Sequence, residues 1–393
     1  MLLGLLSSLP TFGIDMILPA LSATGIAFGV PASEVGLAMS AYLLGVGAAL
    51  VIYGPISDRF GRKSVIVSGC ALLIVASVGC IFARSLTELL FSRALQGAGA
   101  SGPGMGAATI VRDLFDGAEA RAKMSYVVFA VNIVPMVAPT VGAALLVLGG
   151  WQAIYLVPIA GACVLLLAMR GLPETARISP NARLRPGVVI RDYLRVLMHP
   201  VCLGYILCNA AAAGAVFAYI TGSSLFFINV LGLSPTRYGL IFGASSLAVM
   251  AGTIVNTRLS RWGASPGQLI TLGLMLSTLL AAFLLAMSLA GSKSIAPVVL
   301  VMVGVALSFG LISPNAMSGA LQPTPEIAGS ASAVMAFFQM AAAALSSGLV
   351  SNFFDGRSAF SMAAVMLCFC LLAIASYAGV ARPAERFAAD AAY

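Results

Sequence analysis

Charged side chains are scarce in this sequence: Asp, Glu, Lys and Arg make up 9% of the residues, whereas hydrophobic residues make up 60%. Soluble domains carry about a quarter charged residues, so this balance argues against a water-soluble helical core. Histidine is also nearly absent, because His199 is the only one. One histidine supplies neither a cluster of metal ligands nor the Ser–His arrangement of an intramembrane hydrolase. We therefore expect no metal site, no cofactor and no enzymatic activity.

Cysteines are few, and none lies in a polar environment. All seven fall within apolar stretches of the sequence. We expect them to act as small packing residues and not to form disulfides. They are Cys70, Cys80, Cys163, Cys202, Cys208, Cys368 and Cys370.

Long apolar runs are what the sequence has in abundance. A bilayer core of about 30 Å needs roughly 20 apolar residues per helix, and twelve runs are suited to that length. They are rich in Gly, Ala and Leu and contain isolated prolines, which suits helices packed closely in lipid. The first run has no basic segment before it, so we interpret it as a span and not as a secretory signal. We expect an all-α membrane protein with 12 transmembrane helices, at approximately residues 2–28, 35–56, 64–83, 86–111, 124–148, 151–169, 201–230, 238–257, 268–290, 295–318, 327–353 and 358–380.

The basic residues are distributed unevenly over the expected connections. If the amino terminus is cytoplasmic, sixteen of the 21 lie on the inner side and four on the outer side, with Arg93 inside a run. This bias predicts that both termini are cytoplasmic. The net charge of +8 then reflects membrane topology, and we expect no nucleic acid partner. The inner set is Arg59, Arg62, Lys63, Arg112, Arg121, Lys123, Arg170, Arg177, Arg183, Arg185, Arg191, Arg195, Arg258, Arg261, Arg382 and Arg386, and the outer set is Arg84, Arg237, Lys293 and Arg357.

A polar stretch divides the runs into two sets of six. Residues 171–199 open with Leu172–Thr175 and contain several arginines. We expect a cytoplasmic linker here, with a basic face toward anionic lipid headgroups. It would join an N-terminal six-helix bundle (1–170) to a C-terminal bundle with a short tail (200–393). A weak internal repeat, offset by 202 residues, is consistent with two related halves.

The second and third runs are separated by a charged segment, Gly54–Lys63. It combines turn-forming residues with four charges, which a membrane-spanning helix could not hold. We therefore expect a tight loop on the aqueous side. Asp58 can pair with Arg59 or Arg112 there, or accept hydrogen bonds from a helix amino terminus, and such contacts would latch the cytoplasmic side in one state of a transport cycle. The basic residues can equally serve as a topology anchor.

Two ionisable residues, Asp15 and Arg93, are expected well inside the hydrocarbon. A charge there costs at least ~2.5 kcal/mol and usually faces a cavity and serves a function. At 1.5 Å per residue, Asp15 lies ~21 Å from the cytoplasmic side and Arg93 ~10 Å from the outer side, so they meet at a similar level. A carboxyl in an apolar cavity favours its neutral form, and a nearby guanidinium favours its ionised form. Changing access to Arg93, water or a cationic substrate would then load or release a proton at Asp15; a purely architectural ion pair is the alternative.

Two further groups of residues are candidates for function. The fifth run contains Pro135, Pro139 and Gly142; proline bends a helix, and small neighbours let it rock against its partner. Kinked packing without any export role is an equal alternative on the residues alone. A substrate cavity needs an apolar and aromatic lining with few polar groups, although aromatic residues inside helices are more often packing or lipid-facing. The cavity candidates are Tyr42, Asn132, Phe226, Phe338 and Gln339.

Several of these segments resemble motifs of the major facilitator superfamily. Gly54–Lys63 resembles the loop between its second and third helices, and Arg93–Ser101 resembles its fourth-helix motif. Pro135–Ala143 is similar to a relaxed antiporter motif of drug exporters, with alanines at two commoner glycine positions. Together with Asp15–Leu21 and Gly150–Tyr155, these segments resemble the 12-helix drug:proton antiporter group, nearest its bicyclomycin/chloramphenicol-resistance branch. The resemblance is strong in the first half and rests mainly on hydropathy in the second.

The resemblance implies a major facilitator fold of two pseudo-symmetric six-helix bundles. It also implies three groups of site residues. The proton-coupling group is Asp15, Arg93 and Gln96, with Gln96 orienting Arg93; the cytoplasmic gate motif is Gly54, Asp58, Arg59, Gly61, Arg62, Lys63 and Arg112; and the antiporter-like motif is Pro135, Pro139 and Gly142.

The function implied by the resemblance is proton-coupled efflux of small amphipathic drugs or related compounds across a bacterial inner membrane, by alternating access. The proton gradient supplies the energy, and we expect a monomer in the lipid bilayer with both ends in the cytoplasm. A proton-coupled importer or exporter of a specific small metabolite would share the fold and the Asp15 and Arg93 residues. A non-transporting sensor is a further alternative, and it would need an appended soluble domain.

Overall fold

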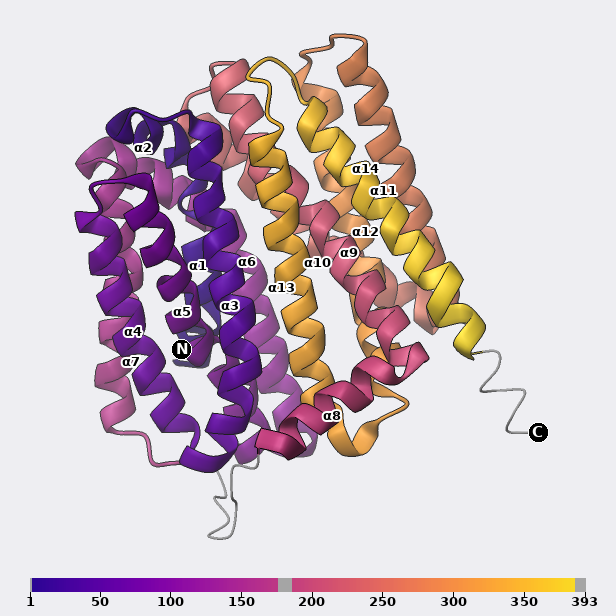
Figure 1. The fold of residues 1–393 in the computed structure, drawn as a ribbon. Coiled ribbons are helices and arrows are strands. Elements are labelled where there is room, and N and C mark those ends of the chain that lie inside the picture. Colours follow the sequence, from indigo (N-terminus) through magenta and orange to yellow (C-terminus); the bar gives the residue numbers. More distant parts are fainter. Residues whose placement is uncertain (1, 176–185, 386–393) are drawn as a thin grey trace. The chain divides into compact units, whose positions relative to one another are not determined.

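The computed structural model describes residues 2–175 and 186–385, and every regular element in that part of the chain is a helix (Figure 1). The elements before the linker are α1 (Leu2–Asp15), η1 (Leu18–Ala20), α2 (Leu21–Phe28), α3 (Ala32–Phe60), α4 (Arg62–Phe82), α5 (Leu86–Leu114), α6 (Gly117–Gly149), η2 (Trp151–Tyr155) and α7 (Leu156–Arg170). Those that follow are α8 (Pro186–Met198), α9 (Pro200–Ser224), η3 (Leu225–Val230), α10 (Pro235–Arg261), α11 (Pro266–Leu289), α12 (Ile295–Leu321), η4 (Pro325–Ile327), α13 (Ala328–Asn352), α14 (Phe360–Ser376) and η5 (Tyr377–Ala381).

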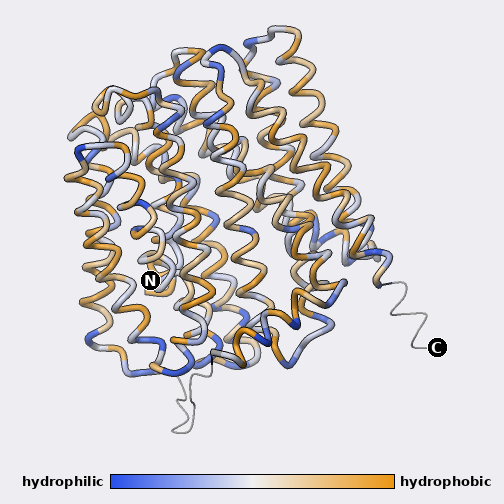
Figure 2. The backbone as a smooth tube through the Cα atoms, viewed as in Figure 1, coloured by the Kyte–Doolittle hydropathy of each residue, from blue (hydrophilic) through white to orange (hydrophobic). Residues whose placement is uncertain are grey.

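Eleven helical segments of the described residues are long and apolar enough to cross a membrane, and they coincide with eleven of the twelve expected runs. The remaining run forms α5, whose 29 residues include several glycines, which lower its mean hydropathy. At 1.5 Å per residue α5 is ~43 Å long, more than the ~30 Å of a bilayer core. Figure 2 shows hydrophobic residues along the lengths of the helices, with hydrophilic residues mainly at their ends and in the connections. The chain is therefore an all-helical, multi-pass membrane protein.

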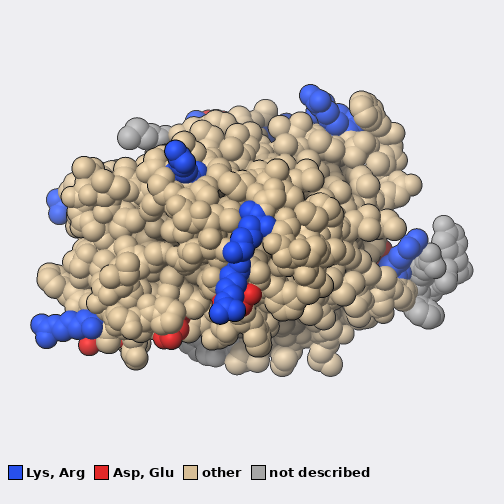
Figure 3. Space-filling model, turned by 90° about the horizontal axis from the view of Figure 1, so that it is seen from above, with Lys and Arg blue, Asp and Glu red and all other residues tan. Residues whose placement is uncertain are grey.

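The sides of these helices carry exposed apolar residues. Val75, Leu279 and Leu371 are 67%, 69% and 51% exposed, a condition that would be unfavourable in water but is suited to contact with acyl chains. Figure 3, which looks onto the ends of the helices, shows charged side chains there singly or in small groups. The scarcity of charge noted in the sequence thus corresponds to surfaces that face lipid.

The segment Gly54–Lys63 is not the loop that we expected from its composition. Helix α3 continues through Phe60, and α4 begins at Arg62, so Gly61 is the single non-helical residue between them. Its φ of 93° is a backbone conformation that glycine adopts without steric cost. The expectation was wrong because a helix can extend beyond the hydrocarbon and carry its charged residues into water.

The chain forms two compact units. One comprises residues 1–184 together with Leu233–Ala244, and the other comprises residues 185–232 together with residues 245–393. Helix α10 therefore contributes its first part to one unit and the rest to the other. The domain boundaries expected from the sequence remain a prediction. Of the expected inner basic residues, Arg177, Arg183, Arg185 and Arg386 lie outside the described residues, as does the tail beyond Glu385.

Close backbone contact between α3 and α5 positions the candidate functional residues of the first unit. A Cβ atom at Gly97 of α5 would collide with the carbonyl of Tyr42, and one at Gly45 of α3 would collide with the carbonyl of Ala94. Small residues at helix interfaces in lipid permit this approach. Because the two helices lie so close together, a long side chain between them is held in direct contact with the neighbouring helices.

Candidate functional site

Asp15 lies at a break in the first membrane span. Helix α1 ends at this residue, and the 3₁₀ turn η1 begins three residues later, at Leu18. Proline in a helix has no N–H to donate, and its ring clashes with the carbonyl four residues earlier; Pro19 stands in that relation to Asp15. The sequence therefore dictates the break where the acid occurs. The Asp15 side chain is 3% exposed, as expected for an acid within the span.

Arg93 links three helices inside the first unit. Its side chain is 1% exposed; Nη2 donates to the carbonyl of Gly13 at 2.8 Å, and Nη1 donates to Oε1 of Gln96 at 2.6 Å. A longer bond of 3.3 Å runs from Nε to the carbonyl of Ala38. The guanidinium also lies 4.3 Å from the ring centroid of Tyr42, within the range of a cation–π interaction. The planar guanidinium thus ties α5 to both α1 and α3.

The structure places Asp15 and Arg93 at a similar level without pairing them directly. Arg93 bonds to a carbonyl two residues before Asp15 on α1, which agrees with the depths estimated from the rise per residue. No ion pair in the described part of the chain joins the two side chains. Arg93 is instead held by neutral oxygens and an aromatic ring, so its positive charge is fixed near Asp15 but not neutralised by it.

Gln96 lies between Arg93 and helix α4. Its Oε1 accepts the bond from Arg93, and its Nε2 donates to Oγ of Ser77 at 2.8 Å. The side chain is completely buried. This geometry is the one that the resemblance implies for a residue that orients Arg93, and the role itself remains a prediction.

Tyr42, a cavity candidate, is fully buried against α1 in this conformation. Its hydroxyl donates to the carbonyl of Pro10 at 2.9 Å, and its ring leaves no room for a Cβ atom at Gly13. The ring also contacts the Arg93 guanidinium. Tyr42 therefore supports Arg93 here, and contact with a substrate remains a prediction that requires the helices to move.

At the gate motif, the ion pairs differ from those that we expected, and the role of the motif remains a prediction. Arg62 donates from Nη1 to Asp58 at 2.6 Å and from Nε to Asp113 at 2.9 Å, whereas we expected Asp58 to pair with Arg59 or Arg112. Asp58 precedes Arg62 by four residues, and the continuation of α3 to Phe60 brings the two side chains together. Arg112 is exposed, and its neighbour Asp113 supplies the acidic group from α5.

Glu174, at the start of the linker, is a member of this cluster that sequence reasoning missed. Its carboxylate accepts from the backbone N–H of Arg62 at 2.8 Å and from that of Lys63 at 3.2 Å. Lys63 in turn donates from Nζ to the carbonyl of Leu172 at 2.8 Å. The first N–H groups of a helix lack intrahelical partners and favour a negative charge, so Glu174 caps α4. The signal was the acid in Leu172–Thr175, but nothing local connects it to a helix 112 residues earlier.

The antiporter-like motif contacts the break beside Asp15. Helix α6 contains Pro135 and Pro139, and a Cβ atom at Gly142 would lie 2.5 Å from the carbonyl oxygen of Met16. The first part of α10, which belongs to the same unit, packs nearby on α6: a Cβ at Gly239 would lie 3.1 Å from the backbone of Pro139. A movement of α6 would therefore displace the backbone of Met16, the residue that follows Asp15.

The remaining cavity candidates form hydrogen bonds or ring contacts with neighbouring residues of the protein. Asn132 donates to the carbonyl of Val128 in its own helix at 2.8 Å. In the second unit, Phe226 is completely buried and packs on Phe227, with ring centroids 5.8 Å apart. Phe338 packs edge-on against Phe337, and Gln339 accepts a bond from Asn209 at 3.2 Å. Their predicted contact with a substrate remains untested.

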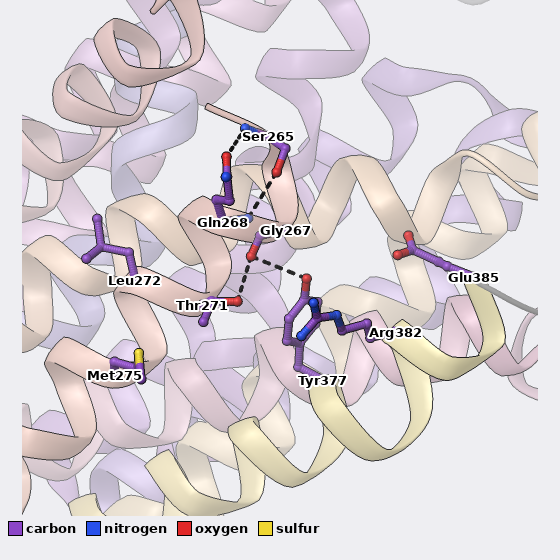
Figure 4. A pocket seen from close by; sticks show the side chains of 9 residues that line it. All are labelled: Ser265, Gly267, Gln268, Thr271, Leu272, Met275, Tyr377, Arg382 and Glu385. Atoms are coloured by element: carbon purple, nitrogen blue, oxygen red, sulfur yellow. Dashed lines mark hydrogen bonds between the residues drawn. The ribbon is translucent and has the colours of Figure 1, made fainter. Parts of the chain in front are cut away.

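A pocket of about 700 Å³ in the second unit lies between the start of α11 and the end of the described chain (Figure 4). Tyr377 donates to the carbonyl of Gly267 at 3.4 Å within it. None of the site residues expected from the sequence lines this pocket, so we do not assign it to the transport site. The lining residues are Ser265, Gly267, Gln268, Thr271, Leu272, Met275, Tyr377, Arg382 and Glu385.

Comparison with solved structures identifies the fold. A bacterial homologue of the human lysosomal transporter Spinster, in an inward-facing and occupied conformation, matches with a TM-score of 0.74 and 15% identity; the match covers 98% of this chain and 96% of the other. A D-xylose–proton symporter matches with a TM-score of 0.70 and 16% identity, covering 96% of each chain. At such identities the likeness shows the fold alone, which is that of major facilitator transporters.

Sequence comparison identifies relatives along most of the chain. A protein of Haemophilus influenzae named bicyclomycin resistance protein homolog is 26% identical over 380 residues, covering 95% of this chain and 94% of the relative. The multidrug resistance protein MdtL of Escherichia coli is 28% identical over 337 residues, covering 85% and 83%. The family model of the Major Facilitator Superfamily matches residues 3–347. This chain, with its broken first helix, buried arginine and capped α3–α4 turn, belongs to the major facilitator superfamily of membrane transporters.

Proposed function

We propose that this transporter exports small amphipathic compounds in exchange for protons, by alternating access. The observation that carries the proposal is the position of Asp15: an acid in the middle of a membrane span, at a helix break, near a fixed positive charge that does not pair with it. Ionisable groups inside membranes are costly, and proton relays are among their established uses. The resistance-related names of the relatives support drugs or similar compounds as the cargo.

The contacts around Asp15 suggest how protonation couples to movement. Gly142 of α6 packs on Met16, the residue after Asp15, so a shift of the kinked helix α6 changes the surroundings of the acid. Arg93 keeps its charge throughout, because a guanidinium is not deprotonated in proteins. In this proposal Asp15 takes up a proton from the outer side and releases it to the cytoplasm, while the substrate moves the other way.

The proposal also sets the location and orientation of the chain. It would reside in the inner membrane of a bacterium as a monomer, with both termini in the cytoplasm, as the distribution of basic residues predicts. Arg59, Arg62 and Lys63 would then lie on the cytoplasmic side. Once the seven native cysteines have been replaced by serine or alanine, single cysteines are placed beside these residues. Labelling of these cysteines in intact cells and in inverted vesicles tests this orientation.

The decisive experiment uses Asp15→Asn, which keeps the size of the side chain and removes the titratable group. A substrate is first found by profiling drug susceptibility in a pump-deficient host, and uptake is then measured in proteoliposomes with an imposed pH gradient. We expect Asp15→Asn to abolish accumulation driven by the gradient but to retain exchange of substrate across the membrane. Glu119→Gln removes an exposed acid at the start of α6 and serves as the control. Gradient-driven accumulation at the normal rate in Asp15→Asn would refute the assignment.

A further inference from the structure

Helix α8 is too short to cross a membrane, although it directly precedes a helix that does. Its 13 residues span ~20 Å at 1.5 Å per residue, less than the ~30 Å of the hydrocarbon core. His199 is the single residue between α8 and the span that begins at Pro200. The carboxyl end of α8 is therefore fixed at the boundary of the bilayer by chain connectivity alone.

One face of α8 packs on the second unit. Val196 is completely buried, and the half-buried Val189, Tyr193 and Leu197 lie on the same side of the helix. This side is directed to α9 and α13, with which α8 makes its principal contacts. The packed face is thus already apolar, and an ordinary surface helix would have a polar opposite face.

The apolar surface of α8 extends beyond the packed face. Ile190, Leu194 and Met198 follow one another at intervals of four residues, which places them in one row along a helix. They are 56%, 51% and 81% exposed. A row of three large exposed apolar side chains is unfavourable in water and indicates a contact with another apolar medium.

A basic row runs beside the apolar one. Arg191 and Arg195 are exposed and also lie four residues apart, and His199 continues the row. Both rows border a recess of about 580 Å³, into which Asp192 contributes the one acidic group among its lining residues. Apolar and basic rows side by side are typical of helices that lie in the plane of a membrane containing anionic lipids.

We propose that α8 lies on the membrane surface and binds anionic phospholipid. Ile190, Leu194 and Met198 enter the boundary between headgroups and acyl chains, and Arg191 and Arg195 bind lipid phosphate groups. Arginine suits this role because its planar guanidinium binds phosphate through two parallel hydrogen bonds. A lipid surface explains both rows at once, whereas a soluble acidic partner would leave the apolar row unexplained. The assignment goes beyond the proposed function, since it does not depend on what is transported.

The first test measures lipid binding by the whole protein. The purified protein in mild detergent is titrated with phosphatidylglycerol or phosphatidylcholine, and bound lipid is counted by native mass spectrometry. We expect a preference for phosphatidylglycerol that becomes about 30-fold weaker in the double variant Arg191→Gln/Arg195→Gln, which corresponds to about 1 kcal/mol per arginine. The matched control is Arg258→Gln/Arg261→Gln, which removes two exposed arginines from the end of α10 in the same unit. An equal loss in the control, or no loss in the α8 variant, overturns the proposal.

The second test locates the apolar row. Leu194→Trp in nanodiscs adds one fluorophore to the signal of Trp151 and Trp262, the two native tryptophans. Lipids brominated near the carbonyl groups should quench the added emission, and iodide in the aqueous phase should not. Quenching by iodide alone would place the row in water. Protection from both quenchers would mean that a protein surface or a second copy of this chain covers it, and either outcome overturns the proposal.

Discussion

Replacing Arg93 by methionine removes the guanidinium and keeps a long apolar side chain, so it measures the tie between α5, α1 and α3. Two short hydrogen bonds, to Gly13 and Gln96, are lost, together with the contact to the ring of Tyr42. Side-chain hydrogen bonds inside membrane proteins contribute about 0.6–1.7 kcal/mol each, and a desolvated cation–π contact contributes about 2 kcal/mol. We therefore expect the variant to lose about 3–5 kcal/mol of stability by these terms.

Thermal unfolding of the purified protein in detergent checks this figure. For a unit of this size, 1 kcal/mol corresponds to roughly 2–4 °C, so the midpoint should fall by about 6–20 °C. Arg93→Lys keeps the charge, but one ammonium cannot reproduce the fork of the guanidinium, so its midpoint should lie between those of Arg93→Met and the unaltered protein. Arg84→Met removes an exposed arginine and should change the midpoint little. The reasoning fails if Arg93→Met and Arg84→Met unfold at the same temperature.

Three further comparisons follow from the packing of the first unit. Gly142→Ala places a Cβ 2.5 Å from the carbonyl oxygen of Met16 and should lower the transport rate at least tenfold. Gly329→Ala in α13 meets nothing within 4 Å and should transport normally; equal rates in the two variants would contradict the contact. Asp113→Asn should lower the unfolding midpoint more than Asp58→Asn, because the Asp113 side chain is 17% exposed and that of Asp58 is 70% exposed. Exposed ion pairs contribute only about 0–1 kcal/mol to stability. The opposite order of midpoints would show that burial does not decide the strength of these two ion pairs. Gly61→Ala would force alanine into a backbone conformation with positive φ and bring its Cβ against the Glu174 carboxylate. The free energy of unfolding, measured with denaturant, should fall by about 1–3 kcal/mol. An unchanged denaturation midpoint would contradict this expectation.

The fold was largely predictable because a membrane-spanning helix requires a long run of apolar residues, which can be identified from the sequence alone. Each apolar run was long enough to be identified by length alone, and the structure places helices at all twelve. Even α5, which is too polar to stand out by hydropathy, was expected from the apolar run at residues 86–111. The helix break at Asp15 also has a local cause, since Pro19 follows the acid at the distance where its ring blocks the helix.

What the sequence could not supply were partners that are distant along the chain. Arg93 was expected near Asp15, but its hydrogen bonds to α1 and α3 go to backbone carbonyls, and any residue type provides a carbonyl. Glu174 was likewise invisible as a cap, because the N–H groups that it accepts from carry no sequence signal. Gly54–Lys63 was predicted to be a loop because of its charges. The sequence did not reveal that α3 extends beyond the hydrocarbon and carries Asp58 and Arg59 in its last turns.

The bond between Glu174 and the start of α4 has a practical consequence for dissecting the protein. Every atom of that anchor lies at or before Thr175, so a chain interrupted after this residue keeps α4 capped. Two separately expressed fragments, joining at that point, would leave the first fragment with its charged turn intact. Such a split pair offers a way to ask whether continuity of the polypeptide is needed for transport at all.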